Sequence, residues 1–398
     1  MRFDWNFDFK RLLPRKGLSA LAASVMAIVI GLIFGYFVML VAYPENAWQG
    51  LKCILTCGYS VNENIDIFNK NIANTFFYAI PIMMTGLAVG FAFKMGLFNI
   101  GASGQFTAGL YCAIYAGFMW QDMLPPSIHW ILCILMGMLG GMIWGLIPGL
   151  FKALLNVNEV ITSIMFNYIG MYLVNMLVMN NGSMYDAVRT RTRYLPVSAQ
   201  IPAYGETHTS LNISLFFVVG FAIFLYIILQ YTTFGYELKA TGFNKYASEY
   251  AGMKGKKNMI LTMVIAGAFA GLGGAFSILA PSTIPGSSMT YEPIEVIASQ
   301  GFNGIAVALL GNCHPLAILF SGTFISYIQR GGTVANLIGY KPEIIDVVIG
   351  IIIYFSAFAM LMNTTAINGL HTLYQRIQNK IKRTTPPVEI TKEEEANQ

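Results

Sequence analysis

Charged side chains are scarce in this chain of 398 residues. Asp, Glu, Lys and Arg make up 11% of it and hydrophobic residues make up 56%, whereas an average soluble domain is about 25% charged. A water-soluble core of this length could not bury so much apolar surface. The composition therefore excludes a soluble globular protein and indicates that a lipid bilayer surrounds much of the chain.

The sequence also lacks the motifs by which proteins hydrolyse ATP or hold a catalytic metal. It contains no G-x-x-x-x-G-K-[ST] phosphate-binding loop and no H-E-x-x-H pair, and the glycine–lysine run that begins at Gly252 has the wrong spacing. The four histidines are scattered at the edges of apolar segments: His129, His208, His314 and His371. We therefore expect a protein that is not an enzyme, with no catalytic residue, no cofactor and no metal site. Energy from ATP would have to come through a partner chain.

The five cysteines give no sign of a disulfide framework. Cys112, Cys133 and Cys313 fall in or beside apolar segments, where packing is the simplest role. Cys53 and Cys57 lie four residues apart between the first two apolar segments. A metal or a disulfide is an alternative at this pair, although no histidine accompanies it.

Ten apolar segments are candidates for transmembrane helices, which need roughly 20 apolar residues each. Seven are clear: Leu18–Tyr43, Ile72–Phe93, Ile128–Phe151, Asn158–Val178, Leu211–Gln230, Met259–Ala280 and Ile344–Met362. Three more are shorter or richer in glycine: Phe106–Trp120, Pro293–Gly311 and Pro315–Ile328. The chain is therefore expected to cross the membrane about ten times.

Small residues recur at every fourth position in two of these segments. The third clear segment carries Gly137, Gly141, Gly145 and Gly149, and the sixth carries Gly267, Gly271 and Ala275. A spacing of four places such residues on one face of a helix, where they let two helix backbones approach closely in lipid. The pattern predicts tight helix packing at both segments.

The positive charges indicate which side of the membrane each loop occupies. An even number of spans places both termini on one side, and an excess of Lys and Arg marks that side as cytoplasmic. With cytoplasmic termini, seven of the 24 Lys and Arg residues lie outside: Lys52, Lys70, Arg189, Arg191, Arg193, Arg330 and Lys341. We expect an all-α polytopic membrane protein with cytoplasmic N- and C-termini. Spans two to five and seven to ten enter from opposite sides, so an inverted repeat is possible.

The chain is expected to form one membrane domain without a soluble module. Its parts are a cytoplasmic segment 1–17, a transmembrane domain 18–362 and a cytoplasmic tail 363–398 that is first basic and then acidic. The longest expected external loop, residues 179–210, contains Arg189, Arg191 and Arg193. This loop is either a solvated connection or a platform for an extracellular substrate-binding protein whose acidic residues pair with the arginines.

A first polar run, residues 98–105, interrupts two apolar segments. It offers the aromatic ring of Phe98 and the amides of Asn99 and Gln105, between glycines that permit tight backbone turns. Polar residues inside apolar sequence usually face a cavity or a partner. The run is either an ordinary turn with a helix cap or a broken helix beside a translocation path.

A second polar run, residues 158–167, opens the fourth clear segment. At helical spacing Glu159, Thr162 and Phe166 fall near one face, with Asn167 beside it. This stripe either contacts a neutral polar solute or joins two helices.

Two further segments stand out by their glycines. Residues 301–311 have small residues at both ends, which predicts a tightly packed short helix that turns back at the cytoplasmic face. Residues 233–253 form a polar, helix-prone segment between two apolar spans, on the side expected to be cytoplasmic. Such a segment is typical of a docking site for another protein.

These four segments, in their order along the chain, resemble the signatures of one family. They read FNIGASGQ from Phe98, NEVITSIMFNY from Asn158, TFGYELKATGFNKYASEYAGM from Thr233 and GFNGIAVALLG from Gly301. The family is the membrane permease subunit of bacterial ABC importers for simple sugars, branched-chain amino acids and nucleosides. The resemblance covers about Ile72 to Met362 and is closest to the nucleoside branch. The chain departs from the pattern at four positions: Ser103, where an acidic residue is expected, Lys239, Lys245 and Ser248.

The resemblance implies a role for each segment. Residues 231–257 would be the coupling loop that seats on a separate ATPase subunit, through Gly235, Glu237, Leu238, Gly242, Asn244, Tyr250 and Gly252. The substrate pathway would pass Phe98, Asn99, Gln105, Glu159, Thr162, Phe166 and Asn167. The implied partners are the ATPase, which binds the ATP, a second permease chain and an extracellular substrate-binding lipoprotein. The implied location is the bacterial plasma membrane.

Three alternatives to nucleoside import remain open at this point. One is a membrane scaffold or receptor, which would move no solute at all. The same architecture could import a ribose-like sugar or a branched-chain amino acid. A stand-alone channel or a secondary transporter would need no ATPase, and changes in residues 231–257 would leave its transport unaffected.

Overall fold

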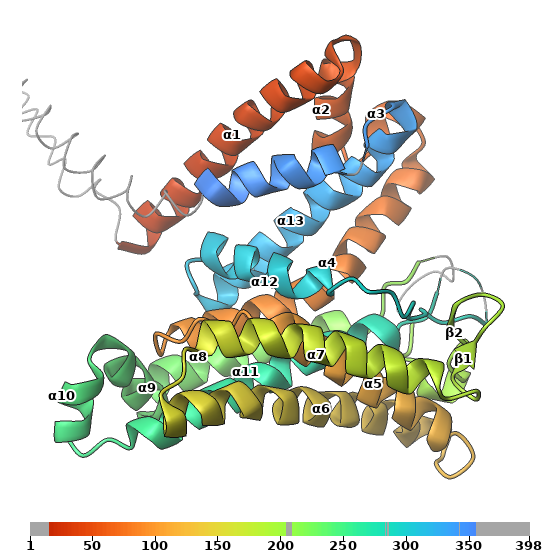
Figure 1. Ribbon diagram of the computed structural model, residues 1–398. Helices are drawn as coiled ribbons and strands as arrows, with labels where there is room; N and C mark the ends of the chain where they lie inside the picture. Colours follow the sequence, from red (N-terminus) through yellow and green to blue (C-terminus); the bar gives the residue numbers. More distant parts are fainter. Residues whose placement is uncertain (1–15, 204–208, 283, 285, 342, 356–398) are drawn as a thin grey trace, which may run out of the picture.

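The computed structural model describes residues 16–203, 209–282, 284, 286–341 and 343–355, which are mostly helical (Figure 1). The first half contains α1 Lys16–Ala42, α2 Ala47–Leu55, α3 Tyr59–Asn62, α4 Ile65–Phe93, α5 Ala102–Met119, α6 Pro126–Leu155 and α7 Glu159–Met179. The second half contains α8 Ser214–Tyr231, α9 Thr233–Phe243, α10 Lys245–Tyr250, α11 Gly255–Ile278, α12 Ser299–Leu310 and α13 Pro315–Ala335. Between α7 and α8 lies a small antiparallel hairpin of β1 Tyr185–Asp186 and β2 Arg191–Thr192. Residues 343–355 are also helical.

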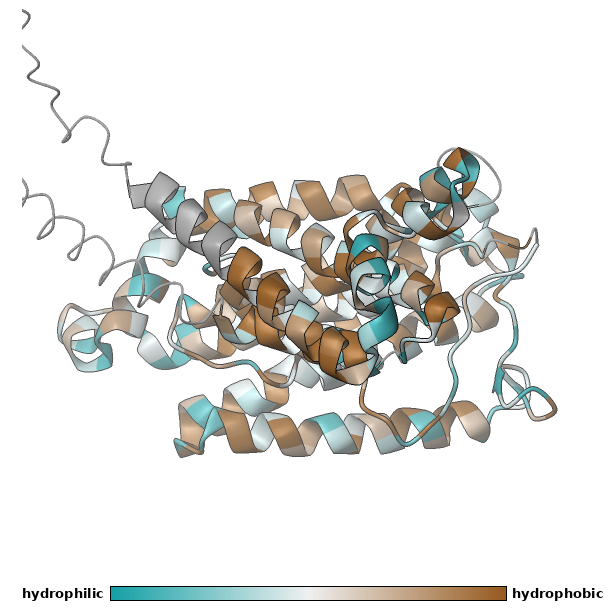
Figure 2. Cartoon of the chain, turned by 90° about the horizontal axis from the view of Figure 1, so that it is seen from above, coloured by the Kyte–Doolittle hydropathy of each residue, from teal (hydrophilic) through white to brown (hydrophobic). Residues whose placement is uncertain are grey.

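Within this described part, five helices are long and apolar enough to cross a membrane: α4, α6, α7, α8 and α11. Apolar residues recur along the helices (Figure 2), and several have exposed side chains: on α7, Ile161 is 57% exposed and Met165 is 58% exposed. Surfaces of this kind suit lipid or another membrane protein rather than water. The expectation of a helical polytopic membrane protein is confirmed at this level. The number of ten spans, the side of the termini and the inverted repeat stay predictions.

The structure differs from the expected span Pro293–Gly311. Only α12 is helical there, and its 12 residues extend about 18 Å at 1.5 Å per residue, less than the ~30 Å hydrocarbon layer. The described residues before it, 279–282, 284 and 286–298, follow an irregular path in which Gly286 has a φ of +76°. Pro281 and Pro293 lie in this stretch, and proline removes the backbone donor that a helix needs. Within the expected span, irregular backbone is therefore followed by a half-length helix.

The two predicted glycine stripes pack on each other. A Cβ atom built on Gly137 would lie 2.6 Å from the Cβ of Ala275, and one on Gly141 would lie 2.7 Å from the Cα of Gly271. The backbones of α6 and α11 therefore touch along this line, as the spacing of four predicted. Dispersion between closely packed backbones holds helices together where no water is excluded.

Helices α5, α6, α7, α8 and α11 have roughly parallel axes, whereas α1 and α13 run obliquely to them (Figure 1). The common axis of the five helices separates the two ends of the bundle. The short helices α9 and α10 lie at one end, and the β1–β2 hairpin lies at the other. Polar side chains start two of the long helices, since Asn64 accepts hydrogen bonds from Asp66 N and Ile67 N, and Asn158 accepts one from Val160 N. The bundle thus presents one candidate site at each end and one between α5 and α7.

Candidate translocation, coupling and docking sites

Two amides at the start of α5 form a closed pair. Asn99 Nδ2 donates to Gln105 Oε1 at 2.9 Å, and Gln105 Nε2 donates to Asn99 Oδ1 at 3.2 Å. Both side chains are buried. The pair locks the turn that connects α4 to α5, because a buried amide that loses its partner leaves unpaired donors and acceptors.

Asn167 joins α7 to this turn. Its Oδ1 accepts from the backbone N–H of Gly104 at 2.8 Å, and its Nδ2 donates to the carbonyl of Ile100 at 3.0 Å. Gly104 lies in the first turn of α5, where helix N–H groups have no partner inside the helix. A side chain from α7 therefore caps α5, and this structure supports the helix-joining alternative for Asn167.

Replacing Asn167 with alanine should destabilise the folded chain. The change removes the cap and leaves the buried Gly104 N–H and Ile100 carbonyl unpaired, at a combined cost of about 2–4 kcal/mol. We expect a clear drop in melting temperature in detergent. The matched control is Asn180→Ala, at the exposed end of the same helix. If both variants melt like the wild type, Asn167 does not hold α5 and α7 together.

The two aromatic residues assigned to the pathway pack against other aromatic rings. The Phe98 ring lies 5.5 Å from the Phe93 ring. The Phe166 ring lies 5.9 Å from that of Trp144 and 6.2 Å from that of Phe151. Both side chains are half-buried, so each presents part of its surface outward and uses the rest for packing.

Glu159 and Thr162 lie at the turn between α6 and α7. The Glu159 carboxylate pairs with Lys152 Nζ at 2.7 Å, and the Thr162 hydroxyl donates to the carbonyl of Asn158 at 3.1 Å. A carboxylate in the first turn of a helix also interacts favourably with the helix dipole. The structure thus places Glu159 and Thr162 at one end of α7 and the three amides Asn99, Gln105 and Asn167 deeper between the helices. Direct contact of any of these residues with a solute stays a prediction.

The coupling segment is anchored through its buried side. Leu238 is fully buried, and Glu237 Oε2 accepts a hydrogen bond from Asn258 Nδ2 at 2.9 Å. A Cβ on Gly242 would lie 2.6 Å from the carbonyl carbon of Met95, so α9 touches the backbone of the α4–α5 turn. Gly235 makes the same kind of contact with Leu229, at 2.7 Å from its Cα. The segment is therefore held rigidly against the ends of three long helices.

The remaining two coupling residues shape the ends of α10. Asn244 caps this helix by accepting from the backbone N–H of Ala247 at 3.0 Å. Gly252 follows the helix with a φ of +83°, a left-handed conformation that favours glycine. Asn244 and Gly252 thus define the two ends of helix α10.

The outward side of this segment carries aromatic residues that the sequence interpretation largely missed. Phe243 and Tyr250 are each 95% exposed, Tyr246 is 74% exposed and Tyr236 is 66% exposed. Of these, only Tyr250 was predicted. The signal available in the sequence was five aromatics, these four and Phe234, within a polar segment of 21 residues. Exposed aromatics are enriched where proteins bind partners.

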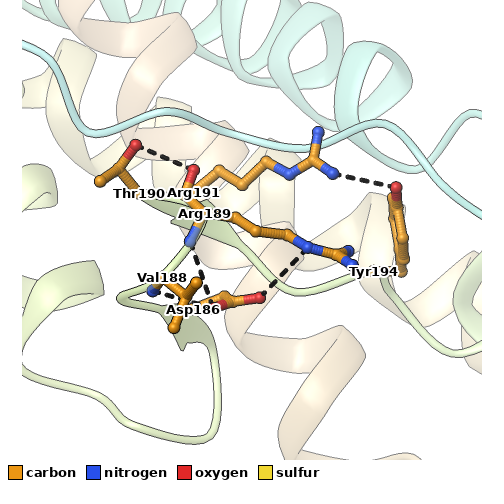
Figure 3. Close-up of polar contacts among 6 residues, drawn as sticks. All are labelled: Asp186, Val188, Arg189, Thr190, Arg191 and Tyr194. Atoms are coloured by element: carbon orange, nitrogen blue, oxygen red, sulfur yellow. Dashed lines mark hydrogen bonds and ion pairs between the residues drawn. The ribbon is translucent and has the colours of Figure 1, made fainter.

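The hairpin at the opposite end forms a positively charged pocket. Its volume of about 150 Å³ is lined by Asp186, Arg189, Arg191, Thr192, Arg193 and Tyr194. Arg189 Nε lies 3.8 Å from Asp186 Oδ2, and Arg191 donates to the Tyr194 hydroxyl at 3.0 Å (Figure 3). The lining contains one carboxylate and three guanidinium groups, so the pocket carries net positive charge and suits an anionic group.

The two cysteines near the first predicted external loop are buried and free. Burial raises the pKa of the Cys53 thiol to about 11 and also raises that of Cys57. A metal ligand would need the thiolate, which these pKa values disfavour at neutral pH. Among the described residues, no group of three His, Cys, Asp or Glu side chains could hold a metal ion.

Comparison with known proteins identifies the family. Residues 71–357 match the family described as the permease component of branched-chain amino acid transport systems. The guanosine ABC transporter permease NupP of Bacillus subtilis is 33% identical over 86% of this chain and 94% of its own length. The nucleoside ABC transporter permease NupB of Lactococcus lactis is 33% identical over 84% of this chain and 89% of its own. The glucose ABC transporter permease TsgB13 of Haloferax volcanii is 27% identical over 70% of this chain and 73% of its own.

No solved structure gives a significant match. The family match covers well over half of the chain. NupP and NupB are similar to the chain over most of their own length. This chain belongs to the family of ABC transport-system permease components.

Proposed function

We propose that this chain is the permease subunit of an ATP-driven importer and forms the translocation path for nucleosides. The observation that carries the proposal is the similarity, over 86% and 84% of the chain, to permeases named for guanosine and nucleoside transport. The chain would cross the bacterial plasma membrane about ten times with cytoplasmic termini. Helices α9 and α10 would face the cytoplasm, and the β1–β2 hairpin would face outward.

The proposed partners follow from the two ends of the bundle. A separate ATPase subunit would bind ATP and dock on the aromatic side of α9 and α10. A substrate-binding lipoprotein would dock on the arginine pocket with acidic side chains. A second permease chain would complete the path, because apolar and aromatic side chains are exposed along α7.

Uptake in cells tests this proposal. Labelled uridine, guanosine, ribose and leucine are offered to cells that lack the gene and to cells complemented with it, with and without ATP depletion. We expect ATP-dependent uptake of the nucleosides alone to be lost on deletion and restored on complementation. Loss of ribose or leucine uptake instead would assign a different substrate to the same type of importer. Uptake that is unaffected by ATP depletion would indicate a channel or a secondary transporter.

A sugar is the second candidate, and one specific observation favours it. The relative named as a glucose permease matches 70% of this chain, although at a lower identity of 27%. The ribose arm of the uptake experiment decides between the two, since a sugar permease would not need the nucleobase.

The exposed aromatics of the coupling segment should carry part of the ATPase contact. Burying a phenylalanine side chain stabilises an interface by about 1.5–3 kcal/mol, so Phe243→Ser should weaken ATPase binding about tenfold or more. Tyr250→Ser should act similarly. Neither change should unfold the permease, because both side chains are 95% exposed. Co-purification of the permease with the ATPase measures the effect. Val188→Ser, at a 93% exposed site on the opposite hairpin, is the control and should retain binding.

Reversing the charge of the arginine pocket should weaken binding of the lipoprotein. Replacing Arg189, Arg191 and Arg193 with Glu turns attraction of acidic groups into repulsion, which should reduce affinity about tenfold or more at low salt. Salt should shrink the difference, because exposed charges are screened beyond about 10 Å at 0.1 M. Affinity of the lipoprotein for permease vesicles is measured across a salt series, with Lys52→Glu as the control. Unchanged affinity at low salt would leave the hairpin as a solvated loop.

A further inference from the structure

The segment that leads into α12 enters the depth of the bundle as irregular, non-helical backbone. Asn175 lies four residues before the end of α7, about 6 Å inside it, and its Nδ2 donates to the carbonyl of Ile294 at 2.8 Å. Gly301, in the first turn of α12, packs against Ser103 at the opposite end of the bundle, in the first turn of α5. Residues 295–300 therefore lie between the two ends of the membrane-spanning helices (Figure 1).

This segment is fixed on the side of α7. The Tyr291 hydroxyl donates to Asn175 Oδ1 at 2.7 Å, so one amide holds the chain at two points three residues apart. Tyr291 is also bound to the hairpin, because its backbone N–H donates to Thr192 Oγ1 at 2.9 Å. The backbone immediately before Glu295 is thus held by hydrogen bonds to α7 and to the hairpin.

A carboxylate lies at this depth without a charged partner. Glu295 is exposed, and so is Ser299, four residues further on at the first position of α12. Within the described residues, the ion pairs are Lys152 with Glu159 and Arg189 with Asp186, so neither includes Glu295. A charged side chain facing hydrocarbon is costly, and such residues face a water-filled cavity or a polar partner.

The beginning of α12 also lacks partners for its polar groups. Ala298 at the N-cap position provides no side-chain hydrogen bond, and the first N–H groups of a helix have no intrahelical acceptor. The Ser103 hydroxyl, in contact with Gly301 of this first turn, is buried, with 1% of the residue exposed, and has no hydrogen-bond partner. Unpaired groups at membrane depth are tolerated where they are buried in protein, as the Ser103 hydroxyl is, or where they line a water-filled space. Ser299, the first residue of α12, is exposed, so the start of this helix is open on one side.

Two tyrosines of α7 face the same side. Tyr172 and Tyr168 lie three and seven residues before Asn175, a spacing that puts all three on one face of a helix. Their side chains are 51% and 49% exposed. They lie nearer the middle of α7 than Asn175, at about 4.5 and 10.5 Å from it along the helix at 1.5 Å per residue. Exposed aromatic faces along this helix suit a flat nucleobase.

We propose that Glu295 and the first turn of α12 form a binding site for the ribose of a nucleoside in transit. The two carboxylate oxygens of Glu295 accept hydrogen bonds from the vicinal 2′- and 3′-hydroxyls, as carboxylates do for the ribose of dinucleotides. The uncapped N–H groups of α12 bind a further oxygen of the sugar, and Tyr168 and Tyr172 lie beside the base. The site rests on the proposed function and adds the sugar as the part of the solute that this chain recognises.

The site is tested by comparing a nucleoside that has the 2′,3′-diol with one that lacks it. Maximal uptake rates of uridine and of 2′,3′-dideoxyuridine are measured in cells with wild-type permease and with Glu295→Gln, at saturating solute. The lipoprotein is the same in both strains, so its own preference cancels in the comparison. Glu295→Gln should lower the uridine rate about tenfold, the effect expected for hydrogen bonds to a charged group, and leave the dideoxyuridine rate unchanged. Glu292→Gln, also exposed and three residues away, should behave like the wild type.

Each outcome separates the ribose site from the proposed function. If wild-type cells take up neither nucleoside, the proposed function fails and the site fails with it. If the wild type imports uridine and Glu295→Gln leaves the ratio of the two rates unchanged, only the ribose site is overturned. A proportional loss of both rates, accompanied by loss of co-purification with the second permease chain, would instead assign Glu295 to the contact between the two permeases.

Discussion

Replacing Gly242 with leucine should abolish uptake while leaving the permease inserted in the membrane. The added Cβ would lie 2.6 Å from the carbonyl carbon of Met95 and 2.8 Å from the carbonyl oxygen of Lys94, both of them backbone atoms that cannot rotate away. Helix α9 would have to move away from the α4–α5 turn. A rigid contact is what allows closure of the ATPase to move the helices as a body, so its loss should uncouple ATP hydrolysis from transport.

Uptake of labelled nucleoside and the amount of permease in isolated membranes are measured together for this variant. We expect uptake to fall at least about 100-fold with the membrane content within about twofold of the wild type, since a 2.7 kcal/mol coupling loss already gives that factor. Gly220→Leu, in α8, is the matched control. It adds the same side chain where a Cβ has nothing within 4 Å, so its uptake should stay within about twofold of the wild type. Normal uptake by Gly242→Leu would remove α9 from the coupling path.

Replacing Gly271 with leucine should prevent stable folding of the bundle. A Cβ there would lie 2.8 Å from the Cα of Gly141 on α6, so the two helices must separate. Overpacking a well-packed core costs about 1–3 kcal/mol and occasionally more. The cost here should exceed that range, because the obstacle is backbone along the whole α6–α11 contact.

Yield and thermal unfolding in mild detergent measure this effect. We expect little or no monodisperse Gly271→Leu protein, and a lowered melting temperature for the milder Gly271→Ala. Gly220→Leu is the control, since Gly220 lies in the middle of α8 and a Cβ there has nothing within 4 Å. A Gly271→Leu variant that melts like the wild type would contradict the close backbone contact.

The helix packing could be predicted from sequence where a repeat determined it. The glycines of α6 and α11 recur every fourth residue, and this spacing alone specifies a narrow face on each helix. The half-length α12 could not be predicted in the same way. The apolar composition of α12 continues into Pro293–Ala298, so hydropathy predicts a longer helix. In the structure this part is non-helical, and Asn175 on a distant helix binds the carbonyl of Ile294.

In the candidate sites, too, contacts within one sequence run could be predicted and contacts between distant helices could not. Asn99 and Gln105 lie six residues apart, so their proximity could be expected from one polar run. The cap that Asn167 provides for Gly104 crosses 63 residues and depends on how α7 packs against α5. The exposure of Phe243 likewise depends on which side of α9 the bundle covers. Sequence patterns give the faces of single helices, whereas these contacts depend on how two helices are placed.

ATP-dependent accumulation of nucleoside in proteoliposomes would show that this permease is part of an ATP-driven nucleoside importer. The purified permease is reconstituted with its second permease chain and the ATPase, with nucleoside-loaded lipoprotein on one side and ATP on the other. We predict accumulation of guanosine or uridine that requires both ATP and the ATPase and that Gly242→Leu eliminates. Accumulation without the ATPase, or no accumulation of any nucleoside by an assembly that hydrolyses ATP, would contradict ATP-driven nucleoside import through this permease.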